Sequence, residues 1–163
     1  MDKIDQVLEY LCKLGIKYNI YRHPPLPTIE VALQYWKDIP GTHCKNLFFR
    51  NHKGDQHYLV IFECHHNLDI HDLEKRLKQG KLSFASPGRM ERYLGLTPGT
   101  VSPFGLINDT QHHVKLFIDS KLLETDLLSF HPNINTASIV INRTDFEEFL
   151  KSCSNEYTYM DLY

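Results

Sequence analysis

Two apolar segments separated by a short turn-forming linker constrain the fold of this chain more than any other feature. HCKNLFFRN occupies residues 43–51, QHYLVIFEC occupies residues 56–64, and the linker NHKGD contains the Asn, Gly and Asp that favour turns. This arrangement predicts two antiparallel strands joined as a hairpin. Because both strands are rich in apolar residues, we expect the hairpin to lie in the middle of a sheet.

The rest of the chain alternates helical and strand patterns. Apolar spacing and capping residues predict helices at about 2–14, 28–36, 69–80 and 86–95, and a last helix with a capping box made by Thr144 and Glu147. Strand patterns cover 18–23, 114–120 and 136–142, the prolines of HPPLPT (23–28) predict a stiff connection, and 96–106 is a predicted loop. The sequence therefore predicts an α/β (α+β) fold, with a mixed, largely antiparallel sheet flanked by helices.

The length and composition suit one domain over residues 1–163. The chain has 163 residues, 42% of them hydrophobic, which is within the usual size of a domain. Its longest apolar runs, such as Tyr58–Phe62, are too short to cross a bilayer. The four cysteines are scattered without a CxxC pair, which is typical of thiols in a reducing compartment. We expect a cytoplasmic protein that does not bind membranes.

The net charge of −2 argues against a protein that binds nucleic acid through bulk electrostatics, and we expect no DNA partner. One segment is locally basic, because only Glu74 and Glu91 accompany a group of cations on two neighbouring predicted helices. These cations are Lys75, Arg76, Lys78, Lys81, Arg89 and Arg92. A solvated helix surface is the simpler interpretation of this cluster.

The ten histidines raise the question of a metal site. The close groups are His43-Cys44, Cys64-His65-His66 and His112-His113, and none has the spacing of known ligand motifs. Adjacent residues of a strand point to opposite faces, so such pairs rarely chelate one ion. There is also no GxSxG motif and no cysteine in a known catalytic context. We expect neither a metal nor another cofactor.

Lys45 and Asn46 are polar exceptions in the first half of the hairpin. At period two, Lys45 shares a sheet face with Leu47 and Phe49, whereas Asn46 points to the opposite face. A lysine on a buried face must lose its charge, find an anion, or extend its methylene stem to solvent. The residue pattern alone leaves these three outcomes open.

Two loops contain further candidates. In Gly99-Thr100-Val101-Ser102-Pro103, Gly and Pro impose an unusual backbone path that can direct N–H groups to one point, where they would hold a carbonyl oxygen or a phosphate. In FHPNINTAS (130–138), His131 precedes a proline and two asparagines ahead of a strand. Taken singly, the first is explained by a tight turn and the second by a histidine that closes a loop.

Together these segments resemble the aminoacyl-tRNA editing family that includes YbaK and the insertion domain of bacterial prolyl-tRNA synthetases. Within it, the chain is most similar to the free-standing ProX/PrdX-type branch. The similar segments are HPPLPTIEVA (23–32), HCKNLFFRN (43–51), LSFASPGRMERYLGLTPGTVSPFGL (82–106) and FHPNINTASIVI (130–141). They occur in order over nearly the whole chain, and they combine a Lys-Asn pair, a GxxxP loop and an HPxxN segment.

This resemblance implies a YbaK-like fold and a deacylase of mischarged tRNA(Pro), with alanyl-tRNA(Pro) as the expected substrate. Lys45 then meets the negative charge of the tRNA end or of the ester, which is the second of its three outcomes, and Asn46 orients the terminal nucleotide. The amides of the loop from Gly99 to Pro103 grip the carbonyl or the ribose. His131 shapes the amino-acid pocket more than it transfers protons. The substrate 2′-hydroxyl assists the attacking water, so no general base is required.

Several further residues are assigned to substrate binding through the same resemblance. They are Thr100, Val101 and Ser102 in the loop, and Tyr21 and His23 at the end of the first strand. Thr28, Ile29 and Val31 border the same region, but helix capping and core burial explain them equally well. The implied partner is the acceptor end of aminoacylated tRNA(Pro), with transient contact to prolyl-tRNA synthetase left open.

Three alternatives remain at this stage. A deacylase for cysteinyl-tRNA(Pro), or for another small residue, shares the same motifs, because pocket volume decides the choice. A non-catalytic module that binds tRNA or a synthetase has no evident need for the combination of Lys45, the GxxxP loop and His131. A metal-dependent hydrolase is distinguished by its sensitivity to a chelator.

Overall fold

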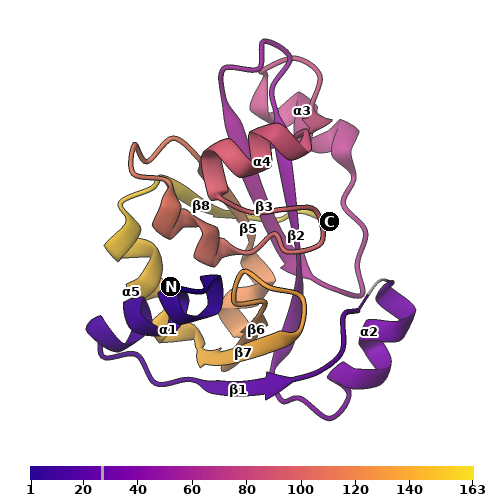
Figure 1. Ribbon diagram of the computed structural model, residues 1–163. Coiled ribbons are helices and arrows are strands. Elements are labelled where there is room, and N and C mark those ends of the chain that lie inside the picture. Colours follow the sequence, from indigo (N-terminus) through magenta and orange to yellow (C-terminus); the bar gives the residue numbers. More distant parts are fainter. Residues whose placement is uncertain (27) are drawn as a thin grey trace.

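The computed structural model describes residues 1–26 and 28–163, and it has an eight-stranded sheet in that part of the chain (Figure 1). The strand order is β1-β7-β6-β2-β3-β5-β8, and β4 pairs with β2 beside this path. The strands are β1 (Asn19–Arg22), β2 (Thr42–Arg50), β3 (His57–Glu63), β4 (Ser83–Phe84), β5 (Lys115–Asp119), β6 (Leu127–Phe130), β7 (Ala137–Asn142) and β8 (Tyr157–Met160).

The predicted hairpin is confirmed at the centre of this sheet. β2 and β3 are antiparallel, from the pair Cys44 and Glu63 to the pair Arg50 and His57. The turn between them is held by Asn51, whose Oδ1 accepts hydrogen bonds from the N–H groups of Gly54, Asp55 and Gln56. The asparagine that marks the linker in the sequence therefore fixes the register of the two central strands.

The sheet is mixed, as the sequence predicts. Four strand pairs in the described residues are antiparallel, namely β1 with β7, β2 with β3, β2 with β4 and β6 with β7. Three pairs are parallel: β2 with β6, β3 with β5 and β5 with β8. β4, β6 and β8 were not predicted, because strands of two to four residues leave too short an alternating pattern.

The helices agree with the predicted positions to within a few residues. They are α1 (Lys3–Lys13), α2 (Ile29–Trp36), α3 (Ile70–Leu77), α4 (Pro87–Leu94) and α5 (Arg143–Cys153), with 3₁₀ helices η1 (Pro103–Asn108) and η2 (Ser120–Glu124). Side chains of Thr28, Asp69 and Ser86 cap α2, α3 and α4. α3 ends before the expected Gly80, because Lys78 already adopts a left-handed conformation with φ of 56°. Pro27, in the predicted stiff connection, lies outside the described residues.

The predicted capping box of α5 is wrong. Asn142 is the N-cap residue, with the extended backbone that this position requires, and no side chain makes a capping hydrogen bond there. Thr144 therefore lies inside the first turn, two residues after the capping position. The N–H of Arg143 instead donates to the backbone oxygen of Asp126, so a neighbouring segment satisfies this end of the helix.

Both faces of the central strands are buried. On one face, Phe48, Leu59 and Ile61 belong to a large cluster that also contains residues of α1, α4, α5 and η1. On the other face, Phe49, Val60 and Phe62 pack with Leu73 of α3 and other apolar side chains. Figure 1 shows α3 and α4 near the turn of the hairpin, and α1 beside α5 toward the other end of the sheet.

One side of β2 is left without a strand partner over residues 44–47. β6 pairs with β2 at Thr42 and His43, and β4 pairs with it at Phe49 and Arg50. No strand in residues 1–26 or 28–163 pairs with residues 44–47 on this side, which we call the open edge of β2. It is a gap between two short strands at the middle of the sheet.

Backbone alternation determines which groups face the open edge. The carbonyl of His43 accepts a hydrogen bond from Cys64, beyond the end of β3, and the carbonyl of Phe48 accepts one from Ala85, beyond β4. Since backbone groups of successive residues point to opposite sides of a strand, those of Asn46 face the open edge. This gap therefore offers unpaired strand groups together with the side chains beside them.

No helix in the described part of the chain combines the length and hydropathy needed to cross a membrane.

Candidate active site

A cavity of about 230 Å³ lies at the open edge of β2, and we call it the Lys45 cavity. Five of the predicted site residues line it, namely Lys45, Asn46, Gly99, Val101 and His131. They come from β2, from the loop before η1 and from the segment after β6, which are far apart in the sequence. The fold therefore brings together the Lys-Asn pair, the first part of the GxxxP loop and the histidine.

The ammonium group of Lys45 has polar partners but no carboxylate among them. Its Nζ donates to the backbone oxygen of His66 at 3.0 Å and to Asn67 Oδ1 at 3.4 Å. It also lies 5.9 Å from the centre of the Phe62 ring. The ion pairs of the described residues do not include Lys45. Neutral oxygens orient this cation without neutralising it, which leaves its charge available to an anion.

Asn46 presents a hydrogen-bond acceptor that the described protein atoms leave unused. Its Oδ1 is buried and has no partner among those residues. A buried acceptor without a donor is costly, and native structures rarely keep one without a reason. A hydroxyl or amino group of a bound molecule in the Lys45 cavity would satisfy it.

The loop beside the open edge begins with a tight turn. The N–H of Thr100 donates to Thr97 O at 3.0 Å, and Gly99 has φ of 86°. With Pro98 at the second position and glycine at the third, this is the pattern of a type II turn. The Thr100 hydroxyl is used within the turn, since it donates to Thr97 O and accepts from the Thr97 N–H.

The other two loop residues lie deeper. Ser102 is fully buried, and its Oγ accepts a hydrogen bond from the N–H of Phe104 at the start of η1. Pro103 is the buried first residue of that 3₁₀ helix. The described cavity lining includes Gly99 and Val101 but not Thr100, Ser102 or Pro103. These three residues hold the shape of the loop, whereas Gly99 and Val101 face the cavity.

His131 is held as a neutral ring. Burial lowers its pKa, and the nearby His23 and His43 lower it further, against the opposing effect of a hydrogen bond to Ala137. The ring Nδ1 lies 3.5 Å from Ala137 O, and since a carbonyl only accepts, this nitrogen carries the proton. Nε2 then keeps its lone pair, so His131 is an acceptor at neutral pH.

Trp36, Cys44 and Leu47 also line the Lys45 cavity, although no feature of the sequence singles them out. The Trp36 ring is stacked on His43 with the ring centres 4.8 Å apart, and its indole Nε1 is buried without a partner in the described residues. In the sequence, Trp36 reads as the last apolar residue of a helix. Its indole N–H donor, left unused among the described residues, marks Trp36 as a candidate site residue only once the structure is known.

A smaller cavity of about 10 Å³ adjoins the first, and we call it the inner cavity. The two share Trp36, Cys44 and His131. The remaining lining residues of the inner cavity are His43, Ser129, Phe130 and Ser138. This volume is close to that of one water-sized sphere, so the inner cavity admits a very small group only.

Tyr21 and His23 lie elsewhere. They line a separate cavity of about 360 Å³ together with residues of β1 and the end of α2. His23 nevertheless reaches the wall of the inner cavity, because its Nε2 lies 3.0 Å from the Oγ of Ser138. The structure therefore places His23 behind the inner cavity and Tyr21 away from it.

Glu63, Cys64 and His65 place three potential metal-ligand atoms within 4.8 Å of one another. Because β3 ends at Glu63 and the chain turns there, these residues do not alternate across a sheet as we assumed for Cys64-His65-His66. The Glu63 carboxylate and the His65 ring are hydrogen-bonded to each other. Burial, and the Glu63 charge after it, raise the pKa of Cys64 to about 12, so its thiol stays protonated at neutral pH.

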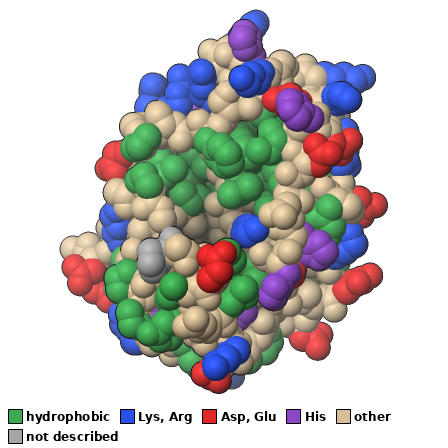
Figure 2. All heavy atoms as spheres, turned by 90° about the vertical axis from the view of Figure 1, so that its right-hand side faces the viewer, with side chains coloured by type: hydrophobic (Ala, Val, Ile, Leu, Met, Phe, Trp, Pro, Cys, Tyr) green, Lys and Arg blue, Asp and Glu red, His purple; other side chains and the backbone are tan. Residues whose placement is uncertain are grey.

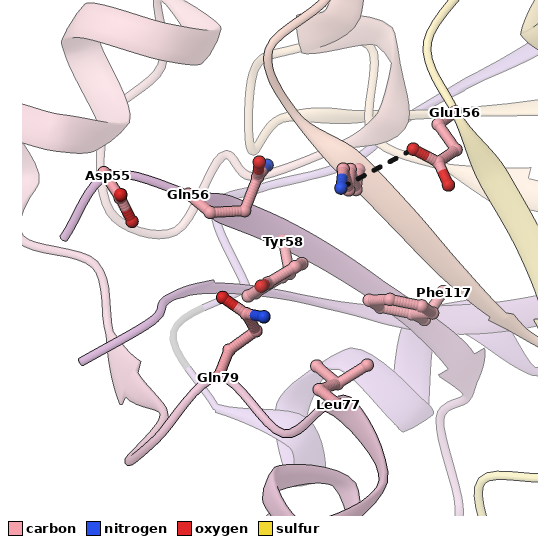
Figure 3. Close-up of a pocket in the computed structure, with 8 residues that line it drawn as sticks. Asp55, Gln56, Tyr58, Leu77, Gln79, Phe117 and Glu156 are labelled. Carbon is pink, nitrogen blue, oxygen red and sulfur yellow. Dashed lines mark ion pairs between the residues drawn. The ribbon is translucent and has the colours of Figure 1, made fainter. Parts of the chain in front are cut away.

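The face of the sheet near α3 carries another cavity, of about 320 Å³, which we call the Tyr58 cavity (Figure 3). Gln56, Tyr58 and Gln79 point into it, and Lys115 forms an ion pair with Glu156 at 3.6 Å on its border. Lys115, the cation of the Tyr58 cavity, is thus already neutralised by a carboxylate. The Lys45 cavity is the smaller of the two, but it holds the unneutralised cation and the unused acceptor.

Comparison with known proteins matches the chain to the editing family that its sequence resembles. Residues 23–149 match the family described as the aminoacyl-tRNA editing domain. The chain is 36% identical over 162 residues to the prolyl-tRNA editing protein ProX of Acetoanaerobium sticklandii, covering 99% of each protein. It is 31% identical over 147 residues to prolyl-tRNA synthetase associated domain-containing protein 1 of Mus musculus, covering 88% of this chain and 86% of that protein.

A solved structure has the same fold. A crystal structure of a protein proposed to be a trans-editing enzyme for prolyl tRNA synthetase superposes with a TM-score of 0.71, covering 99% of this chain and 98% of that one. The two sequences are 21% identical, so this likeness describes the fold.

Proposed function

This chain belongs to the aminoacyl-tRNA editing domain family, and we propose that it is a trans-editing deacylase that removes a wrongly attached amino acid from tRNA(Pro). The name of its full-length relative, a prolyl-tRNA editing protein, supports tRNA(Pro) as the substrate. The observation that carries the proposal is the Lys45 cavity, where an unneutralised ammonium group and an unused Asn46 acceptor lie beside a glycine turn.

The need for such an enzyme follows from the limits of binding selectivity. A synthetase pocket that is large enough for proline admits alanine, and the missing methylenes cost only about 1–3 kcal/mol of discrimination. A second site that accepts small residues and excludes larger ones removes the error. A cavity with a restrictive wall is sufficient for this task.

Lys45 supplies the positive charge at the site. Ester hydrolysis places negative charge on the carbonyl oxygen, and the tRNA end brings its phosphate, so a fixed cation stabilises the transition state or orients the strand. The carbonyl of His66 holds the ammonium group in place. Asn46 accepts a hydrogen bond from the terminal nucleotide, and the backbone of the Gly99–Val101 segment contacts the ester carbonyl or the ribose.

The reaction is a simple ester hydrolysis. Water adds to the carbonyl carbon, the bond from that carbon to the ribose oxygen breaks, and a proton passes to the ribose oxygen. The products are the free amino acid and the uncharged tRNA. The neighbouring 2′-hydroxyl of the substrate positions the water. His131 remains neutral and acts as an acceptor in the wall of the pocket, so that no protein side chain need be a general base.

Alanine is the amino acid we assign. The inner cavity, at about 10 Å³, has room for a methyl-sized group but not for the ring of proline. Its walls are the buried Cys44, Phe130 and Ser138 together with Trp36 and the half-buried His131. Exclusion of proline by this wall protects the correctly charged tRNA.

The test is a comparison of deacylation rates on labelled Ala-, Cys- and Pro-tRNA(Pro), each with and without a chelator. We expect rapid release of alanine, slow release of proline and no effect of the chelator. Rapid release of cysteine would assign a different small substrate. Activity lost on chelation and restored by a metal would point to Glu63, Cys64 and His65, and failure to hydrolyse any of the esters would identify a binding module.

A further inference from the structure

Phe84 is an aromatic residue that the protein leaves exposed. Its exposed fraction is 59%, whereas its strand partner Phe49 is fully buried. The two rings are stacked, with centres 4.7 Å apart and planes inclined by 28°. One face of the Phe84 ring is thus supported by a core residue, and the other is open to a ligand.

Phe84 lies on the same side of the sheet as Lys45. Residues directly opposite each other in paired strands share a face, so Phe84 points with Phe49, and at period two Phe49 points with Leu47 and Lys45. Phe49 lies four positions after Lys45 along β2, which corresponds to about 13 Å. Figure 2 shows hydrophobic side chains gathered in the middle of one face of the molecule, with a hollow below them.

The surroundings of Phe84 carry positive charge. It lies in the segment between α3 and α4, where Lys78 and Lys81 are exposed. Of the two acidic residues nearby, Glu74 is turned inward, since its Oε1 accepts a hydrogen bond from the N–H of Leu82 at 2.8 Å. An exposed ring flanked by cations is the usual composition of a site for single-stranded nucleic acid.

We propose that Phe84 is a stacking platform for a base of the unpaired 3′ end of the tRNA, in a nucleotide that precedes the terminal adenosine. This inference rests on the proposed function, because it assumes that the aminoacyl ester occupies the Lys45 cavity. From there the strand runs along β2 past Leu47 toward β4. The base covers the open face of Phe84, and its phosphates lie toward the cations of the α3–α4 segment.

The experiment compares a long and a short substrate. Steady-state deacylation is measured with alanyl-tRNA(Pro) and with alanyl-adenosine, which lacks the preceding nucleotides. For Phe84→Ala we expect KM for the tRNA to rise about tenfold, because stacking on an aromatic side chain contributes roughly this much per base. The change with alanyl-adenosine should be much smaller. Equal changes for the two substrates, or none for either, would overturn the proposal.

Two further variants separate stacking from stability. Phe84→Leu keeps the apolar contact with Phe49 but lacks an aromatic face, and it should raise KM for the tRNA as Phe84→Ala does. Phe84→Trp should restore the wild-type value. Leu123→Ala removes another exposed apolar side chain, in η2, and is the control. A Phe84→Leu variant with wild-type KM would show that the ring only completes the core.

A binding measurement keeps this proposal separate from the proposed function. The probe is an uncharged oligoribonucleotide ending in CCA, titrated by fluorescence anisotropy against the full chain. We expect Phe84→Ala to weaken its binding about tenfold. If the wild type hydrolyses none of the esters, the deacylase assignment fails, and this titration still decides whether Phe84 binds a single strand. Equal affinity of the wild type and Phe84→Ala for the oligoribonucleotide would refute the proposal that Phe84 stacks on a base.

Discussion

The buried oxygen of Asn46 shows how single residues mark the site. Sequence analysis selected Lys45, Asn46, Gly99, Val101 and His131, and the structure places all five around one cavity. Lys45, Asn46, Gly99 and His131 could be found because polar and glycine residues stand out in apolar segments, whereas Val101 was assigned through the family resemblance of its loop. The other lining residues, Trp36, Cys44 and Leu47, could not, because an apolar residue beside a cavity has the same sequence pattern as one in the core.

Replacing Asn46 by Ala should lower activity without lowering stability. The Oδ1 atom has no partner in the described protein, so its removal relieves a buried unsatisfied acceptor, and the free energy of unfolding should stay unchanged or rise. The lost hydrogen bond to substrate should reduce kcat/KM about tenfold. Urea unfolding and deacylation of alanyl-tRNA(Pro) check the two effects. A parallel loss of stability and activity would mean that Asn46 is a structural residue.

At the scale of elements, the site depends on strands that the sequence did not reveal. The positions of the longer helices and strands follow from apolar periodicity and capping residues, and the central hairpin follows from its linker. The open edge of β2 arises because β4 and β6 pair with β2 near its two ends. Both strands are too short to give a pattern, and β4 has only two residues. A site formed by a gap between such strands is therefore invisible in the sequence.

The turn at Gly99 gives a prediction at this scale. Gly99 has φ of 86° with no atom within 4 Å of an added Cβ, so Gly99→Ala strains the backbone without a clash. The cost is about 1 kcal/mol of stability, and the displaced loop should lower kcat/KM about tenfold. Gly15→Ala is the matched control, because Gly15 has φ of 73° and equally open space at the end of α1.

We expect the two glycine variants to lose similar stability in thermal melts, with only Gly99→Ala losing deacylation activity. Equal activities would show that the turn does not contribute to the site.

At the scale of the whole molecule, a buried histidine network joins the hairpin to α4 and to the segment before β5. Arg89 Nη1 donates to His57 Nε2 at 3.0 Å, so the proton of His57 is on Nδ1, which donates to His113 Nε2 at 2.9 Å. Sequence analysis considered His113 only as a metal ligand, beside His112, and did not single out His57. Their role depends on contacts between residues 32 or more positions apart, which no local pattern contains.

This network predicts a loss of stability in acid. Burial, His113 and the neighbouring arginines lower the pKa of His57 from 6.5 to about 4. Its stabilising contribution is complete above pH 6.5 and is lost as the pH falls from 6.5 to 4, because the unfolded chain binds the proton more readily. We expect a decrease of about 2–3 kcal/mol in the free energy of unfolding over this range.

Urea unfolding at several pH values measures this decrease, with His57→Phe as the test and the exposed His112→Gln as the control. The His57 variant should be less stable at pH 7 but show a flatter pH dependence. An unchanged slope in that variant would assign the acid sensitivity to other groups.

The central claim is that ester hydrolysis takes place at the open edge of β2, and the most direct test compares two lysines. Lys45→Ala removes the unneutralised cation of the Lys45 cavity, and Lys115→Ala removes the cation that pairs with Glu156 at the Tyr58 cavity. With alanyl-tRNA(Pro), we predict that kcat/KM falls by at least about 100-fold for Lys45→Ala and stays near the wild-type value for Lys115→Ala. A large loss for Lys115→Ala, with Lys45→Ala fully active, would contradict this account.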